Sequence, residues 1–151
     1  MTKKVFVIVL NWNGYQDTIE CVESLKGVDY PDLEIIIIDN GSIDDSVEVL
    51  RRRFPALLVL ETGRNLGFAG GANFGIRRAL NDGADYVIVL NNDTVVDEGF
   101  VRELVEAARE HKDAGILCSK VYFYDRPDAI WYAGAEFNTL LGWGRHRGYN
   151  L

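Results

Sequence analysis

Cysteine and histidine, which supply the ligands of most zinc sites, are scarce in this sequence. Its 151 residues include two cysteines, Cys21 and Cys118, and two histidines, and no Cys-x-x-Cys pair is present. A zinc site made of Cys and His ligands is therefore not expected. Two cysteines this far apart in sequence also do not indicate a disulfide framework, and a reducing compartment suits the chain best.

Long apolar runs and an excess of positive charge are also missing. The apolar runs are too short to span a bilayer, and 16 basic against 23 acidic residues give a net charge of −7. Because an acidic chain binds nucleic acid backbones poorly, we expect no nucleic-acid partner. Apolar residues make up 48% and charged residues 26% of the sequence, which is typical of a globular protein. The length favours one domain over residues 1–151.

Short apolar runs rich in β-branched residues recur along the chain and predict strands that are buried on both faces. These runs are residues 5–10, 35–38, 57–60, 86–90 and 115–124. Between them, apolar residues at helical spacing follow Asp17, Asp45, Ala72 and Asp97. This alternation predicts an α/β fold with a mostly parallel sheet and helices on both of its faces. Residues 125–151 carry few helix signals, and we expect loops or a hairpin there.

Polar residues follow each of the first four predicted strands. They are residues 11–14, 39–44, 63–73 and 91–94. In open α/β sheets, ligands bind beyond the carboxyl ends of the strands, where these four segments would converge. Four such segments together indicate a small-molecule site.

Three of these segments allow both a binding role and a purely structural one. Asp39 could accept hydrogen bonds from a ribose or a base, or it could only organise a turn. Gly67, Gly70 and Gly71 could let the backbone approach a diphosphate at a helix N-terminus, or they could only make a loop flexible. Asp93 could hold a divalent cation that it shares with substrate phosphates, or it could only end a strand in a turn.

The four segments, taken in order, resemble those of the family 2 glycosyltransferases, which have the GT-A fold. The matching stretches are residues 7–13, 38–44, 65–73 and 90–93, and the third is most similar to the rhamnosyltransferase-like branch. The resemblance implies a Rossmann-like nucleotide-diphospho-sugar transferase fold. It also implies an inverting enzyme of polysaccharide biosynthesis, which transfers a sugar from a nucleotide-diphosphate donor to a glycan or lipid-linked acceptor.

The resemblance implies roles for individual residues as well. Asp39 matches the acid that reads the nucleoside of the donor, and Asp93 matches the last acid of the motif that holds Mg²⁺ or Mn²⁺ on the diphosphate. The other donor-binding residues that it implies are Asn11, Asn13, Asn65, Gly67, Gly70, Gly71 and Asn92. The metal motif departs from the usual family pattern because Asn91-Asn92-Asp93 carries one carboxylate, a form that occurs in the rhamnosyltransferase-like branch.

The general base of such enzymes, usually an Asp in a Glu-Asp pair, has no match, because the sequence contains no Glu-Asp dipeptide. We therefore expect residues 1–151 to be a donor-binding portion without its acceptor half and base, through truncation or an interrupted gene. If a base lies within the chain, Asp125, Asp128 and Glu136 are the candidates because they follow the fifth predicted strand. We expect a cytoplasmic protein, with peripheral association of the full-length protein at the inner face of the cell membrane.

Three other functions fit parts of the pattern. A signalling receiver domain keeps a lysine where Lys120 lies, but it needs an acidic cluster where strand one ends in Asn11. A sugar-nucleotide pyrophosphorylase needs a Gly-rich, Arg-bearing loop directly after strand one, which residues 11–14 do not supply. A non-catalytic nucleotide-sugar-binding or structural domain is the remaining alternative, and activity with a simple acceptor would separate it from an enzyme.

Overall fold

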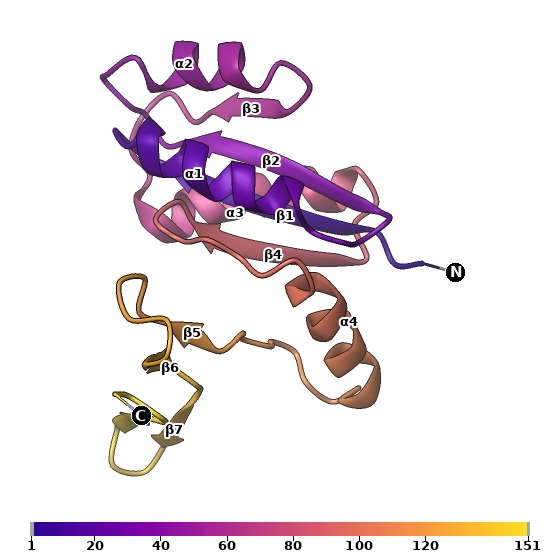
Figure 1. The fold of residues 1–151 in the computed structure, drawn as a ribbon, viewed down its shortest axis with the longest axis vertical. Coiled ribbons are helices and arrows are strands. Elements are labelled where there is room, and N and C mark those ends of the chain that lie inside the picture. Colours follow the sequence, from indigo (N-terminus) through magenta and orange to yellow (C-terminus); the bar gives the residue numbers. More distant parts are fainter. Residues whose placement is uncertain (1, 151) are drawn as a thin grey trace. The chain divides into compact units, whose positions relative to one another are not determined.

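The computed structural model describes residues 2–150, which form two compact units that divide after Val101. The first unit contains, in chain order, β1 (Val5–Asn11), α1 (Tyr15–Lys26), β2 (Leu33–Asp39), α2 (Ser46–Arg53), β3 (Leu58–Glu61), α3 (Gly67–Asn81) and β4 (Tyr86–Asn91) (Figure 1). Helix α4 (Phe100–Glu110) spans the division. The second unit continues with the short strands β5 (Val121–Tyr122), β6 (Ile130–Tyr132), β7 (Ala135–Asn138) and β8 (Trp143–His146).

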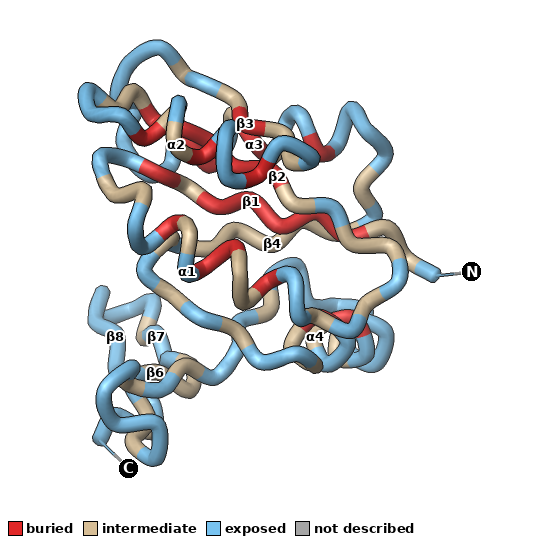
Figure 2. Tube along the Cα trace, turned by 45° about the horizontal axis from the view of Figure 1, so that its top comes forward, coloured by how far each residue is buried: buried red, intermediate tan, exposed pale blue. Residues whose placement is uncertain are grey.

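The first unit is built on a parallel sheet with the strand order β3-β2-β1-β4. Strand β1 pairs in parallel with both β2 and β4, and β2 pairs in parallel with β3. The central strands are the most buried part of the unit, as the red trace of β1 and β2 in Figure 2 shows. Continuous apolar runs are what a strand covered on both faces requires, and the parallel sheet predicted from them is confirmed.

Helices cover both faces of this sheet, and β1 supplies side chains to each face in turn. Val7 and Val9 pack in one buried cluster with residues of α1 and α2. Phe6 and Ile8 pack in a second cluster with Ala79 of α3. The predicted α/β fold with helices on both faces is therefore confirmed.

Helix α3 begins before the residue that the sequence pattern indicates. The expected start at Ala72 is wrong, because the helix spans Gly67–Asn81 and so includes Gly70 and Gly71. Close packing on the sheet explains the small residues here. A Cβ on Gly71 would lie 2.6 Å from Leu10 Cδ1, and a Cβ on Gly75 would lie 2.7 Å from Ile8 Cγ2. These glycines let the helix lie close to β1.

The prediction of a fifth strand is wrong for most of residues 115–124. Of residues 115–124, only Val121–Tyr122 form a strand, and this strand pairs antiparallel with β6 in a separate small sheet. Within the described part of the chain, residues 115–120 belong to no strand, and Ile116 is 87% exposed. Apolar residues form a strand only where a neighbouring strand supplies partners for their backbone hydrogen bonds. Strands β7 and β8 form an antiparallel hairpin, which confirms the expectation for residues 125–150, whereas Leu151 lies outside the described residues.

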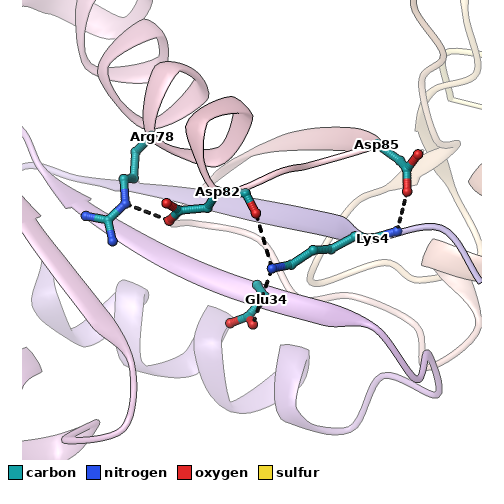
Figure 3. Close-up of polar contacts among 5 residues, drawn as sticks. All are labelled: Lys4, Glu34, Arg78, Asp82 and Asp85. Carbon is teal, nitrogen blue, oxygen red and sulfur yellow. Dashed lines mark hydrogen bonds and ion pairs between the residues drawn. The ribbon is translucent and has the colours of Figure 1, made fainter.

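The start of the parallel sheet is held by charged residues around Lys4 (Figure 3). The Lys4 amide donates a hydrogen bond to Asp85 Oδ2 at 2.8 Å, and Lys4 Nζ donates to the carbonyl oxygen of Asp82 at 3.3 Å. Lys4 Nζ also lies 4.0 Å from Glu34 Oε1, while Arg78 Nε donates to Asp82 Oδ2 at 2.6 Å. These contacts join the starts of β1, β2 and β4 to the end of α3.

Replacing Asp85 by Asn is expected to destabilise the chain at neutral pH and to have little effect in acid. A hydrogen bond from Lys3 and one from the Lys4 amide lower the pKa of Asp85 in the folded chain. A carboxyl with a lowered folded-state pKa stabilises the fold above its unfolded pKa, and this contribution is lost as the pH falls through the folded value. Urea unfolding of Asp85→Asn and of the wild type at several pH values measures the difference. A difference that persists unchanged in strong acid would contradict the explanation.

Candidate functional site

The carboxyl ends of the parallel strands bring the predicted site residues into one row. In the strand ladder, Asn11 is level with Asp39, Asp39 is level with Glu61, and Leu10 is level with Asn91. In the sheet, β2 and β3 lie on one side of β1, and β4 lies on the other side. Ligands of open α/β sheets bind where the strand order reverses in this way. The segments after β1 and β4, residues 12–14 and 92–94, flank this switch point.

The Asp39 carboxylate is buried and hydrogen-bonded within the chain on both oxygens. The residue is 1% exposed. Its Oδ1 accepts hydrogen bonds from the amides of Gly41 and Ser42 at 3.2 and 2.9 Å. Its Oδ2 accepts from Asn11 Nδ2 at 2.8 Å and from the Ser42 hydroxyl at 2.5 Å. A carboxylate has about four lone-pair sites, and these four hydrogen bonds occupy them. Through these bonds, Asp39 organises the turn after β2 and joins that turn to β1.

A chain of hydrogen bonds continues from Asp39 to the segment after β4. A carboxylate only accepts, so Asn11 turns its amide nitrogen to Asp39 and its Oδ1 toward Thr18. The Thr18 hydroxyl donates to Asn11 Oδ1 at 2.7 Å and accepts from Asn92 Nδ2 at 3.0 Å. The same Asn92 nitrogen donates to the Gly14 carbonyl oxygen at 3.1 Å. The side chains after β1, β2 and β4 are thus parts of one network.

Two members of the site, Thr18 and Asn40, were not expected from the sequence. Thr18 is fully buried, and Asn40 is 3% exposed. Asn40 Nδ2 donates to Asn65 Oδ1 and to the Gly67 carbonyl oxygen, both at 3.2 Å, and Asn40 Oδ1 accepts from the Leu66 amide at 3.1 Å. The available signal for Thr18 was a polar residue on the apolar face of a helix. Asn40 offered no more than its place beside Asp39.

The other predicted residues shape the same loops. Asn13 adopts a positive φ of 51°, its amide donates to Ser42 Oγ at 2.9 Å, and its Oδ1 accepts from the Ile43 amide at 2.8 Å. Asn65 Oδ1 accepts from the Gly67 amide at 2.7 Å, where Gly67 has a φ of 70°. The structure therefore brings the loops after β1, β2 and β3 together, while Gly70 and Gly71 lie inside α3.

Asp93 differs from Asp39 in exposure and in its contacts. It is exposed, and among residues 2–150 its carboxylate has no hydrogen-bond or ion-pair partner. The negative charge of Asp93 affects the pKa of Cys21 in α1. The pKa of the Cys21 thiol is raised to about 11, chiefly by burial; a hydrogen bond with Thr94 lowers this pKa, and the negative charge of Asp93 raises it. Cys21 is therefore a neutral thiol at physiological pH and not a nucleophile.

The chemistry of these groups fits a divalent cation that is shared with a ligand. Nowhere in the described chain do three or more His, Cys, Asp or Glu side chains gather as a complete metal shell. Mg²⁺ binding through one or two carboxylates, with substrate phosphates and water as the other ligands, needs no such cluster. Asp93 lies beside the switch point, is exposed, and has no hydrogen-bond or ion-pair partner in the described part of the chain, so it meets that requirement.

The three candidate bases lie in the second unit. Asp125 and Asp128 are exposed in the turn between β5 and β6. Glu136 Oε1 accepts hydrogen bonds from Arg147 Nη2 at 2.7 Å and from Arg147 Nε at 3.1 Å. The Glu136 carboxylate is thus engaged by a cation of its own hairpin.

The family model described as "Glycosyl transferase family 2" matches residues 6–149. This chain belongs to that family. Glycosyltransferase GlyG of Streptococcus pneumoniae is 30% identical over 135 residues, which are 87% of this chain and 44% of that protein. The N-acetylglucosaminyl-diphospho-decaprenol L-rhamnosyltransferase of Mycobacterium tuberculosis is 28% identical over 123 residues, which are 76% of this chain and 39% of that protein. The chain spans less than half the length of these relatives, and the family 2 resemblance seen in the motifs is confirmed.

Solved structures show the same fold. The mannosyltransferase PcManGT from Pyrobaculum calidifontis, solved in complex with GDP-Man and Mn²⁺, superposes with a TM-score of 0.64 at 24% identity. The match covers 72% of this chain and 33% of that protein. The expected GT-A fold is confirmed. Of the helices in residues 2–150, none has the length and apolar character needed to cross a membrane.

Replacing Gly41 by Ala is expected to destabilise the chain more than replacing Gly63 by Ala. Both glycines have a positive φ, 78° and 76°. A Cβ on Gly41 would lie 2.6 Å from Arg64 Cα and from the Asn65 nitrogen, whereas a Cβ on Gly63 would meet nothing within 4 Å. Gly63→Ala should therefore cost only the backbone term, about 1–2 kcal/mol, and Gly41→Ala should also displace the segment before α3. Thermal unfolding compares the two variants, and an equal loss of stability would refute the packing argument.

Proposed function

We propose that this chain binds a nucleotide-diphosphate sugar at the carboxyl edge of its parallel sheet. It would be the donor-binding part of an inverting glycosyltransferase that acts on a glycan or lipid-linked acceptor. The observation that carries this proposal is the contrast between two acids at this edge of the sheet. Asp39 is buried and hydrogen-bonded, which suits a group that shapes a loop, whereas Asp93 is exposed beside the switch point and has no hydrogen-bond or ion-pair partner among residues 2–150. Membership of family 2 supports the donor class.

The nucleoside end of the donor would lie against the loops after β1 and β2. Asn11 and Asn13 are joined to this turn through Ser42, at 3.1 and 2.9 Å, which gives it a defined shape before any ligand arrives. A preformed turn lowers the ordering cost of binding. A direct contact from Asp39 to the nucleoside stays a prediction of the family resemblance.

The diphosphate would lie between the start of α3 and the segment after β4. The amides of Leu66 and Gly67 donate to Asn40 and Asn65, so phosphate would meet the following amides of the first turn of α3 and the positive end of the helix dipole. Gly67 begins this helix, and Arg64 is exposed just before it. Asp93 would hold Mg²⁺ or Mn²⁺ on the diphosphate, with Asn92 beside it. When bound, such an ion offsets the negative charge that develops on a departing diphosphate. The Mn²⁺ in the PcManGT complex supports this choice of metal class.

Neutralising Asp93 is expected to remove the dependence of nucleotide binding on a divalent cation. Calorimetric titration with GDP and with UDP, in Mn²⁺ and again in excess chelator, measures this dependence. Asp93→Asn should weaken binding in Mn²⁺ by about 1–3 kcal/mol, the scale for losing a charged partner, and should change binding in chelator little. Glu34→Gln is the matched control because it removes one exposed carboxylate at the opposite end of the sheet. Equal binding by the wild type with and without Mn²⁺ would contradict the metal role.

Transfer and its stereochemistry separate this proposal from the non-catalytic alternative. Positioned proton transfer contributes about 10²–10⁴-fold to such reactions, and the sequence has no Glu-Asp pair to supply the base. We therefore expect this chain to bind donor but to transfer little or no sugar to a simple acceptor. Nuclear magnetic resonance of any glycoside product reports its anomeric configuration. A product with inverted configuration supports the enzyme class and argues against the non-catalytic alternative, whereas retention contradicts the inverting mechanism.

A further inference from the structure

Thr18 occupies a central place in the site although no ligand could touch it. It lies in the first turns of α1 with no exposed surface. Its hydroxyl is bonded on one side to Asn11, which contacts Asp39, and on the other side to Asn92, which precedes Asp93. We propose that Thr18 is a positioning residue that holds the Asp93 segment in place relative to the loops after β1 and β2. This inference rests on the proposed donor site.

The backbone alone does not hold the Asp93 segment against β1. The ladder between β1 and β4 ends with the pair Leu10 and Asn91, so Asp93 lies beyond the last backbone pairing. After Asp93, the segment is attached to α1 by the hydrogen bond between Thr94 and Cys21 and by the amide of Val96, which donates to Ser24 Oγ at 3.2 Å. Before Asp93, the side chain of Asn92 makes the connection to α1 and to the Gly14 carbonyl.

The direction of the hydrogen bonds makes the Thr18 hydroxyl hard to replace. The hydroxyl donates to Asn11 Oδ1 at 2.7 Å, which is shorter than its 3.1 Å distance to a second acceptor, the Gly14 carbonyl oxygen, and it accepts from the amide nitrogen of Asn92. A side chain of the same shape without the hydroxyl leaves Asn11 Oδ1 without its donor and Asn92 with the Gly14 carbonyl alone. A buried polar group that loses its partner is costly, so Asn11 and Asn92 would turn to other partners. The cation ligand would then lose its set distance from the diphosphate.

The test compares Thr18→Val, Thr18→Ser and the wild type by calorimetric titration with GDP and UDP, in Mn²⁺ and in excess chelator. Valine keeps the shape and removes the hydroxyl, whereas serine keeps the hydroxyl. Thr18→Val should lose about tenfold in affinity in Mn²⁺ and much less in chelator, and Thr18→Ser should stay near the wild type. Tyr30→Phe is the matched control, since it removes a hydroxyl that donates to the Lys3 carbonyl at 2.8 Å, at the opposite end of the sheet. It should alter stability without altering affinity.

The outcomes separate this inference from the proposed function. Metal-dependent binding by the wild type together with unchanged binding by Thr18→Val leaves the donor site standing and overturns the role of Thr18. An equal loss in Mn²⁺ and in chelator also overturns it, because a merely structural residue would act on both. Failure of the wild type to bind either nucleotide overturns the donor site and this inference together.

A second measurement needs no variant, so it stands even if Thr18→Val does not fold. Side-chain amide protons of Asn92 should exchange with solvent more slowly than those of Asn65, which is exposed, because Asn92 Nδ2 donates to both Thr18 and Gly14. Addition of GDP or UDP with Mg²⁺ should slow the exchange at Asn92 further. Exchange as fast as at Asn65, or unchanged by nucleotide and Mg²⁺, would overturn the proposal.

Discussion

A buried carboxylate is the constraint on which the arrangement of this site depends. Charge is expensive to bury unless it is hydrogen-bonded, and Asp39 receives its donors from its own turn and from Asn11 of β1. That requirement sets the orientation of the Asn11 amide. The orientation of Asn11 sets that of the Thr18 hydroxyl, and Thr18 sets that of Asn92. One charge thereby orders polar side chains across the ends of β1, β2 and β4.

The two ends of the sheet are stabilised by different kinds of polar interaction. Around Lys4, the contacts are exposed ion pairs and hydrogen bonds, which contribute little individually and weaken with salt. Around Asp39, the polar groups are buried, and each depends on its neighbour for a partner. A buried network of this kind is rigid when satisfied and costly when one member is removed. The end that holds the candidate site is therefore the end where single substitutions have the larger consequences.

Much of this architecture could be predicted from local patterns, and the failures have physical causes. The buried runs of β1, β2 and β4 and the acids at their ends depend on nearby residues alone. Residues 115–124 have the composition of a strand, but a strand needs a partner that composition does not reveal. Gly67 and Gly70 look like a loop because glycine weakens helices, yet α3 includes them. Thr18 bonds to Asn92, 74 residues away, and no local pattern predicts that contact.

The central claim is that one edge of the parallel sheet holds both the nucleotide and its cation. Paramagnetic broadening of backbone amide signals by Mn²⁺, in the presence of GDP or UDP, tests it most directly, because the effect falls steeply with distance from the ion. The account predicts the strongest broadening at residues 92–94, clear broadening at residues 12–14 and 65–68, and none around Lys4, Glu34 and Asp85. Broadening centred elsewhere, or the same pattern without nucleotide, would contradict it.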